Sequence, residues 1–398
     1  MSGPQEPSTH AAPLGSAATE HPSIEALRGL AALLVLVSHY VVFLQPAGAG
    51  AWGMAATGVD LFFVLSGFVF TRTLAQPGLA VGPHLVRRAF RLYPLYAVAL
   101  LLYAALKADG WQWSTLWPHL LMLHTTGDLA LAAHYNVAFW SLPPEVEFYL
   151  ALPVLATGLA ALARCTGAAL WWLLAAALLM KLGLVGLAQP GEAPDSLRSV
   201  LTVHLPGLLV EFLLGSAAAA AAGHVQSNAW GRPLSPFVRR AAAFVGLALL
   251  VVAFFAYRTH LATPASAVQA PVWLSGNFGL WVAAAFALML LVLKPTVSTS
   301  GRTHGLPASA GSFMQAVALW AGRLSYGLYL FHNAAPVWVQ RWWPGLEGWP
   351  LVWSSVLLTT ALAGVLHWAV EAPCRAYGRS LASAWQRAIN TRMSGDSR

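Results

Sequence analysis

The sequence predicts an all-α polytopic transmembrane helix bundle of about ten helices with both termini in the cytoplasm. Of its 398 residues, 58% are hydrophobic and only 9% are charged, whereas roughly a quarter of the residues of a soluble domain are charged. The apolar residues form repeated long blocks, and roughly 20 residues of helix cross the hydrocarbon core of a bilayer. The 18 Trp and 10 Tyr residues fit this class, because amphipathic rings favour the membrane interface.

The apolar blocks place the expected helices in order along the chain. They lie near residues 24–44, 57–75, 92–107, 145–163, 168–188, 203–223, 241–258, 273–293, 317–340 and 351–371. When successive helices alternate in direction, most of the 22 Lys and Arg residues fall on the side that holds both termini. Under the positive-inside rule this side is the cytoplasm, which predicts a multi-pass protein of the plasma (inner) membrane.

One transmembrane domain, residues 21–375, is expected between two short cytoplasmic tails. Residues 1–20 are rich in Ala, Pro and Ser and lack the positive region of a secretory signal, so they are predicted to be disordered. Residues 376–398 form the expected C-terminal tail. The long aromatic segment between Asp109 and Phe139 contains three histidines, and we interpret it as a loop that can fold back to the outer interface.

Composition and motifs argue against nucleic-acid, metal and permanently bound cofactor sites. The net charge of +8 comes from short basic clusters between apolar blocks, which we interpret as orientation signals rather than as a nucleic-acid surface. The two cysteines, Cys165 and Cys374, lie at segment ends placed in the cytoplasm, where thiols stay reduced. Neither zinc-ligand spacing nor a Gly-rich phosphate loop is present.

Arg28 and His39 lie on one face of the first expected helix. They are eleven residues apart, so at about 100° and 1.5 Å per residue they are within roughly 20° in direction and about 16 Å apart in height. The pair suits a donor whose phosphates contact Arg28 and whose extended arm brings a thioester to His39. In the alternative, Arg28 is an orientation signal and His39 bonds to a neighbouring helix, although ionisable groups inside membranes are functional candidates by default.

Asp60 begins the second expected helix from the outer side, at about the depth that His39 reaches. Its carboxylate can orient the imidazole or pair with an arginine, and an ordinary interfacial aspartate is the alternative. In the same segment we interpret Ser66 and Gly67 as small residues that allow close helix packing rather than as a nucleophile and its neighbour.

Three arginines, Arg87, Arg88 and Arg91, precede the third apolar block. Guanidinium groups bind phosphates through bidentate hydrogen bonds, which predicts a site for a nucleotide-bearing donor. A topology anchor or a contact with anionic lipid accounts for the same cluster.

Two further segments carry polar groups into the bundle. Glu145 and Glu147 open the fourth long helix, where acids favour the positive end of the helix dipole, and they also suit acid-base work or binding of an acceptor hydroxyl. Ser325 and His332 are seven residues apart and return to one helix face, with Tyr329 between them. Tyr329 alone fits packing, and His332 fits either a structural role or contact with an acceptor.

These segments, in this order, resemble the bacterial integral-membrane acyltransferase family three, whose members O-acylate surface polysaccharides, lipopolysaccharide, glycans and some macrolides. The resemblance spans residues 24 to about 375. It rests on the Arg28-to-His39 spacing, Gly58 to Phe68, Arg87-Arg88-Ala89-Phe90-Arg91 with Pro94, Trp140-Ser141-Leu142 with Glu145, Ser325-Tyr326 through His332, and Glu371-Ala372-Pro373.

The resemblance implies that Arg28 and His39 are essential, that the cluster from Arg87 to Arg91 helps to hold acyl-CoA, and that Glu145 lies near the reaction. Ser-Val-Glu-Glu-Gln usually follows Trp-Ser-Leu in the family, and here the sequence is Pro-Pro-Glu-Val-Glu. Glu145 therefore aligns, and Glu147 is doubtful as a catalytic residue. Phe331 replaces a common Trp before the late His, and Ala334 replaces a Pro after it.

We therefore expect a membrane O-acyltransferase that moves an acyl group from cytoplasmic acyl-CoA to a hydroxyl of a carbohydrate or glycoside acceptor. The expected acyl group is acetyl, and the expected donor is acetyl-CoA. The enzyme is also expected to contact membrane lipid. His39 acts as general base or as transient acyl carrier, oriented by Asp60 or Glu145. Arg28, Arg87, Arg88 and Arg91 bind the donor, and Ser325, Tyr329 and His332 bind substrate. The rival functions are a transporter or flippase for a lipid-linked sugar, whose inverted repeats are not visible, and a membrane sensor or scaffold.

Overall fold

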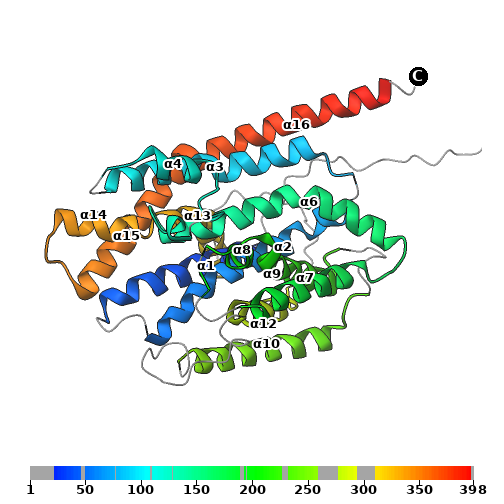
Figure 1. The fold of residues 1–398 in the computed structure, drawn as a ribbon, viewed down its shortest axis with the longest axis horizontal. Helices are drawn as coiled ribbons and strands as arrows, with labels where there is room; N and C mark the ends of the chain where they lie inside the picture. Colours follow the sequence, from blue (N-terminus) through cyan, green and yellow to red (C-terminus); the bar gives the residue numbers. More distant parts are fainter. Residues whose placement is uncertain are drawn as a thin grey trace, which may run out of the picture.

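The computed structural model describes residues 22–45, 50–76, 78–107, 110–127, 129–188, 192–193, 195–225, 232–258, 277–293 and 310–395. Within these ranges every regular element is a helix and no strand occurs (Figure 1). Eight helices there are long and apolar enough to cross a membrane. The predicted all-α polytopic bundle is confirmed, and the predicted N-terminal tail lies outside the described residues.

The long helices follow the predicted apolar blocks. They are α1 (Pro22–Tyr40), α2 (Gly58–Leu74), α3 (Val81–Leu106), α6 (Leu142–Ala163), α7 (Ala169–Gly186), α9 (Leu205–Ala221), α10 (Pro236–Ala256), α12 (Phe278–Leu290), α13 (Ala310–Phe331) and α15 (Gly348–Leu366). The other elements used below are α4 (Trp113–Leu120), α5 (Leu129–Ala132), the 3-10 helix η3 (Val137–Ser141), α8 (Leu197–Val203), α14 (Ala334–Trp342) and α16 (Ala372–Gly395).

Three boundaries differ from those predicted. Helix α3 begins at Val81 rather than near residue 92. Arginine is a good helix former, so the basic cluster extends the helix on the N-terminal side of the apolar block. The helix expected at 317–340 is broken after Phe331 into α13 and α14. The residues predicted as a C-terminal tail belong mostly to α16, which runs along α3 (Figure 1).

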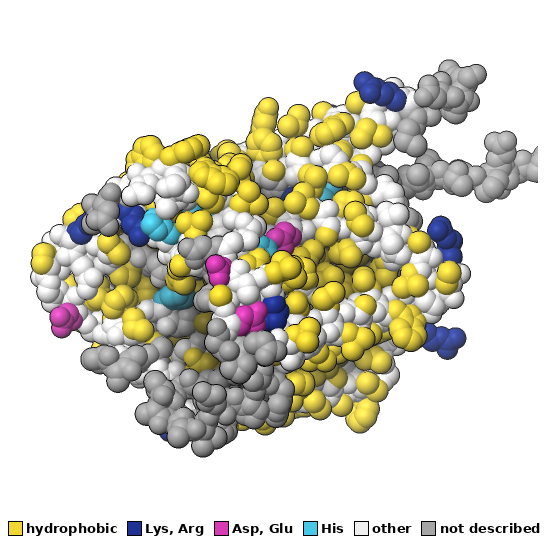
Figure 2. All heavy atoms as spheres, viewed as in Figure 1, with side chains coloured by type: hydrophobic (Ala, Val, Ile, Leu, Met, Phe, Trp, Pro, Cys, Tyr) yellow, Lys and Arg dark blue, Asp and Glu magenta, His cyan; other side chains and the backbone are white. Residues whose placement is uncertain are grey.

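Large apolar side chains cover the outside of the bundle. Phe244 on α10 is 73% exposed and Leu357 on α15 is 70% exposed, and hydrophobic side chains dominate the face seen in Figure 2. A monomeric soluble protein rarely exposes such continuous apolar surface. This surface fits contact with lipid, so the chain is a multi-pass membrane protein.

Small residues bring the central helices together. Helix α1 packs along α13, and α2 packs along α9. A Cβ atom at Gly67 of α2 would lie 1.7 Å from the carbonyl oxygen of Phe212, and one at Gly215 of α9 would lie 1.9 Å from that of Val64. No side chain fits at either position, which confirms the interpretation of Gly67 as a packing residue.

We expect Gly67→Ala to separate α2 from α9 and to destabilise the protein by roughly 1–3 kcal/mol, the usual cost of overpacking. The apparent Tm of the purified protein in detergent measures this change. Gly158→Ala on α6 is the matched control, because nothing lies within 4 Å of its added Cβ. Equal Tm values for the two variants would contradict the close packing of α2 and α9.

Candidate active site

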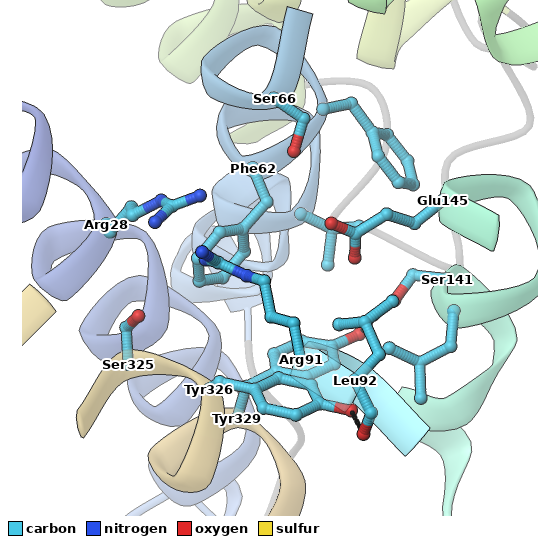
Figure 3. A pocket seen from close by; sticks show the side chains of 13 residues that line it. Arg28, Phe62, Ser66, Arg91, Leu92, Ser141, Glu145, Ser325, Tyr326 and Tyr329 are labelled. Atoms are coloured by element: carbon cyan, nitrogen blue, oxygen red, sulfur yellow. Dashed lines mark hydrogen bonds between the residues drawn. The ribbon is translucent and has the colours of Figure 1, made fainter. Parts of the chain in front are cut away.

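A cavity lies between α1, α2, α3, α6 and α13, with an empty volume of about 550 Å³ that includes open solvent. Its wall combines two cations, one carboxylate, hydroxyls and aromatic rings (Figure 3). The lining residues are Arg28, Val59, Phe62, Phe63, Ser66, Arg91, Leu92, Ser141, Leu142, Glu145, Ser325, Tyr326 and Tyr329.

Arg28 and Arg91 bring positive charge to the cavity from two helices. Figure 3 shows both guanidinium groups pointing inward, Arg28 from α1 and Arg91 from α3. Arg28 pairs with Glu25 at 3.5 Å, and Arg91 interacts electrostatically with Glu145 and Glu371. Two guanidinium groups with fork geometry suit an anionic ligand such as a phosphate.

The other two arginines of the predicted cluster do not line the cavity. Arg88 lies over the rings of Phe70 and Tyr149, 5.0 and 5.8 Å from their centroids, and Arg87 is half-buried elsewhere on α3. The three positions spread over roughly 100° of the helix, so one cavity receives only part of the cluster. Arg91 is also about 6 Å deeper along α3 than Arg87.

Glu145 closes the cavity on the α6 side. Proline occupies the first turn of this helix, where the missing N–H costs nothing, and the carboxylate points into the cavity (Figure 3). The hydroxyl of Tyr149, one turn further on, donates to the Glu145 carboxylate. Glu145 therefore balances the charge of Arg91 inside the cavity.

Glu147 serves a different purpose. Its carboxylate bonds to Nδ1 of His204 and accepts the backbone N–H of Leu205 at 2.8 Å, so it satisfies a donor at the N-terminus of α9. Residues two apart on a helix point about 200° apart. Glu147 is therefore directed away from Glu145, in agreement with its doubtful assignment from the family resemblance.

His39 and His332 meet in the bundle close to the cavity. Their ring centroids are 4.8 Å apart in an edge-on arrangement. Nδ1 of His39 lies 2.9 Å from the carbonyl oxygen of Val35, and Nδ1 of His332 lies 2.8 Å from that of Tyr329. Donation to these carbonyls assigns the proton to Nδ1 of each ring, which leaves a lone pair on each Nε2.

The surroundings of the two imidazoles differ. His39 is half-buried, and the Ser38 hydroxyl lies 3.1 Å from its Nδ1. His332 is fully buried, and its Nε2 has no hydrogen-bond partner among the described residues. A buried polar atom without a partner indicates a place for a ligand group or a water molecule.

Asp60 does not join His39. It hydrogen-bonds to Glu211 and interacts with Lys181, which places the half-buried Asp60 of α2 beside two buried residues of α9 and α7. Four other residues of α2 line the cavity, and Asp60 lies roughly 110° from the middle of that face. The contacts described for His39 Nδ1 are with Val35 and Ser38, so backbone and a hydroxyl, rather than Asp60 or Glu145, hold the ring.

Of the three residues predicted to bind substrate, Ser325 and Tyr329 line the cavity, whereas His332 lies behind them against His39. The Tyr329 hydroxyl donates to the carbonyl of Ala138 and contacts the Ser141 hydroxyl, both at 2.6 Å. It therefore ties α13 to the segment that precedes α6.

Sequence reasoning missed two cavity residues. Ser66 was interpreted as a packing residue, and Tyr326 was not assigned to the site, yet both line the cavity. The Tyr326 hydroxyl donates to the carbonyl of Leu92 at 2.9 Å (Figure 3). A polar side chain inside an apolar span was the available signal for both positions.

Residues 21–368 match the family described as the acyltransferase domain. This stretch contains the whole cavity and both imidazoles. The chain belongs to acyltransferase family three. It is a membrane acyltransferase, an enzyme that transfers acyl groups other than amino-acyl groups.

Curated relatives of this acyltransferase are distant. It is 25% identical over 392 residues to the acyltransferase MdmB of Streptomyces mycarofaciens, with 90% of this chain and 92% of that protein covered. It is 38% identical over 86 residues to protein 2 in the picA locus of Rhizobium radiobacter, which covers 21% of this chain and 43% of that protein. No solved structure matches the chain.

Two histidines of the acyltransferase stack in the segment before η3. The rings of His119 and His124 are 4.3 Å apart and nearly parallel, and both side chains are buried. Burial lowers the pKa of each to about 4, against an ordinary value of about 6.5. Within the described residues, no group of three or more His, Cys, Asp or Glu side chains is placed to hold a metal ion.

Because the folded pKa of His119 lies below the unfolded value, the unfolded chain binds more protons, and stability is lost as pH falls from about 6.5 towards 4. We expect the apparent Tm in detergent to decline over this window and His119→Phe to flatten the decline. The comparison is the slope of Tm against pH for both proteins. Identical slopes would show that His119 binds its proton equally well in the folded and unfolded chains.

Proposed function

We propose that the enzyme transfers an acyl group, acetyl in the first instance, from acyl-CoA to a hydroxyl of a carbohydrate-like acceptor. The observation that carries this proposal is the His39–His332 pair beside a cavity lined by Arg28 and Arg91. A hydroxyl needs a base to attack a thioester, and the donor carries phosphates that need cations. A transporter would use similar intramembrane charges, and membership of an acyltransferase family argues against that alternative.

The donor is proposed to bind along α1. Arg28 and His39 belong to one uninterrupted helix, about 16 Å apart in height. The phosphates of CoA would contact Arg28 and Arg91, and the extended pantetheine arm would place its thioester near His39. Glu25 and Glu145, which face these arginines, hold the guanidinium groups in place before the donor arrives.

In the proposed chemistry, Nε2 of His39 carries the transferred proton or the acyl group. As a general base it takes the hydroxyl proton while the oxygen attacks the thioester carbon; the C–O bond forms, the C–S bond breaks, and the CoA thiolate leaves and receives the proton. As a nucleophile Nε2 first attacks the thioester carbon, the C–S bond breaks, and the CoA thiolate leaves an acyl-imidazole behind. The hydroxyl oxygen then attacks the acyl carbon, the C–N bond to Nε2 breaks, and the hydroxyl proton passes to the thiolate. The contact between Nδ1 and the Val35 carbonyl stabilises the positive ring in both routes.

The enzyme is proposed to lie in the plasma membrane with both termini in the cytoplasm. Figure 2 shows Lys and Arg side chains at the right-hand end of the molecule, where α16 ends in Figure 1, and also at the left-hand end. In the sequence, most of the 22 Lys and Arg residues fall on the side expected to hold both termini. Basic residues favour the cytoplasmic side. The start of α1, with Arg28, then faces the compartment that supplies acyl-CoA.

We expect His39→Ala to lower acyl transfer by about 100-fold or more, the usual contribution of a positioned general base. The measurement is release of CoA and transfer of label from [14C]acetyl-CoA by the purified protein in detergent, with a panel of p-nitrophenyl glycosides as acceptors. Equal activity of a folded His39→Ala variant would remove this residue from the mechanism. Absence of turnover by the wild type with every glycoside would favour the transporter alternative.

We expect Arg91→Ala to weaken binding of acetyl-CoA by roughly 10- to 100-fold, because a charged hydrogen bond contributes about 1.5–3 kcal/mol. Arg87→Ala is the matched control: it removes the same charge from the same helix without altering the cavity wall. Competition with unlabelled CoA gives Kd for each variant. Equal losses in the two variants would point to the net charge of the cluster rather than to the cavity.

A further inference from the structure

A second pocket opens at the other end of the bundle, with an empty volume of about 630 Å³ that includes open solvent. It lies between the C-terminal end of α3, the segment between α5 and η3, and the start of α14. Helices α1 and α3 run from the end that holds Arg28 to the end that holds this pocket. We call it the distal pocket and define it by Lys107, Asn136 and Asn333.

The distal pocket and the active-site cavity share two walls. On one wall Tyr329 lines the cavity and Asn333 lines the distal pocket; on the other, Ser141 lines the cavity and Val137 lines the distal pocket. Each pair is four residues apart, which is about 6 Å at the rise of an α-helix and about 8 Å at that of the 3-10 helix η3. His332 lies between Tyr329 and Asn333 in the chain, and its ring centroid is 6.1 Å from that of Tyr329. The imidazole pair therefore lies next to the wall that the two spaces share.

The break between α13 and α14 opens this partition to polar side chains. A continuous helix would use the carbonyls of Leu330 and His332 in its own ladder. Here Tyr103 and Asn136 donate to the carbonyl of Leu330 at 2.9 and 3.1 Å, and Tyr40 donates to that of His332 at 2.7 Å. Side chains from three segments thus hold the break open and in place.

The distal pocket carries polar groups that remain available to a ligand. The side chain of Asn136 is already hydrogen-bonded within the protein. Its amide nitrogen donates to the carbonyl of Leu330, and its amide oxygen accepts from Ala138 N and from Asn333 Nδ2. It thereby orients Asn333, whose amide oxygen bonds to none of the described residues. Lys107 adds an ammonium group, and Tyr103 and Tyr135 add aromatic walls. Amide, ammonium and aromatic groups together suit the hydroxyls and the apolar faces of a sugar.

We propose that the distal pocket is the acceptor site of the enzyme. The amide of Asn333 and the ammonium group of Lys107 hold a carbohydrate so that one hydroxyl reaches the His39–His332 pair. In the route in which Nε2 of His39 carries the acyl group, that hydroxyl donates its hydrogen bond to the buried Nε2 atom of His332, which has no partner among the described residues. Donor and acceptor therefore approach the pair from opposite ends of the bundle. This inference rests on the proposed acyl transfer and adds the acceptor's binding residues and its side of entry.

A thiol placed in the distal pocket tests this assignment. In a Cys165→Ser, Cys374→Ser background, Ala133→Cys introduces a thiol in the pocket wall. A membrane-impermeant methanethiosulfonate reagent then attaches a bulky group to this thiol and fills the pocket. Trp349→Cys is the matched control, because residue 349 is exposed at the start of α15, after the turn that follows α14, and does not line the pocket. The assay is label transfer from [14C]acetyl-CoA to p-nitrophenyl glycosides, together with equilibrium binding of [14C]acetyl-CoA.

We expect modification of Ala133→Cys to lower transfer by about tenfold or more while donor binding stays unchanged, because a blocked acceptor site removes only the second substrate. Modified Trp349→Cys should retain both activities. Asn333→Ala should raise KM for the glycoside by about fivefold or more, as expected for a lost polar contact, again with the same Kd for acetyl-CoA. Full transfer after complete modification, or parallel loss of donor binding, would overturn the acceptor site and leave the acyltransferase proposal intact. Absence of transfer by the unmodified protein would overturn both.

Discussion

The structure depends on a constraint that hydrocarbon imposes: a backbone carbonyl inside the membrane needs a hydrogen-bond donor from the protein. The break after Phe331 frees two carbonyls, those of Leu330 and His332, and three side chains satisfy them. These side chains come from α1, from α3 and from the segment before η3. The same contacts that make the break tolerable therefore position the helix that carries His39 against the break that carries His332. The candidate active site and the stability of the broken helix share one set of hydrogen bonds.

The position of each carboxylate on its helix decides which partners it faces inside the bundle. Glu145 and Glu147 are two residues apart, and one faces the arginines of the cavity while the other caps α9 through Leu205. On α2, the face with Phe62 and Ser66 lines the cavity, and Asp60 turns to Glu211. Carboxylates that look equivalent in the sequence thus perform separate tasks, since a step of two residues reverses the direction of a side chain.

Much of the fold was predictable because its causes are local. Apolar blocks of about 20 residues mark spans whatever surrounds them, and they located α1, α2, α6 and α7 within a few residues. Gly67 was correctly assigned to packing. The errors in helix boundaries arose where apolar content gave no indication of a helix. Apolar content did not reveal that α3 extends through Arg87 and Arg88, nor that α16 continues as a helix of low hydrophobicity along α3.

By itself the sequence determined the family and the helical bundle, and it singled out Arg28, His39, Arg91 and Glu145 as candidate site residues, because residue type, spacing and length are properties of short segments. Only the tertiary structure decided which of these residues share a space. It excluded Asp60 and Arg88 from the cavity wall, added Ser66 and Tyr326, and paired His39 with His332 across 293 positions of the chain. The rotation of each helix about its axis depends on packing against partners distant in sequence, and no local pattern specifies that rotation.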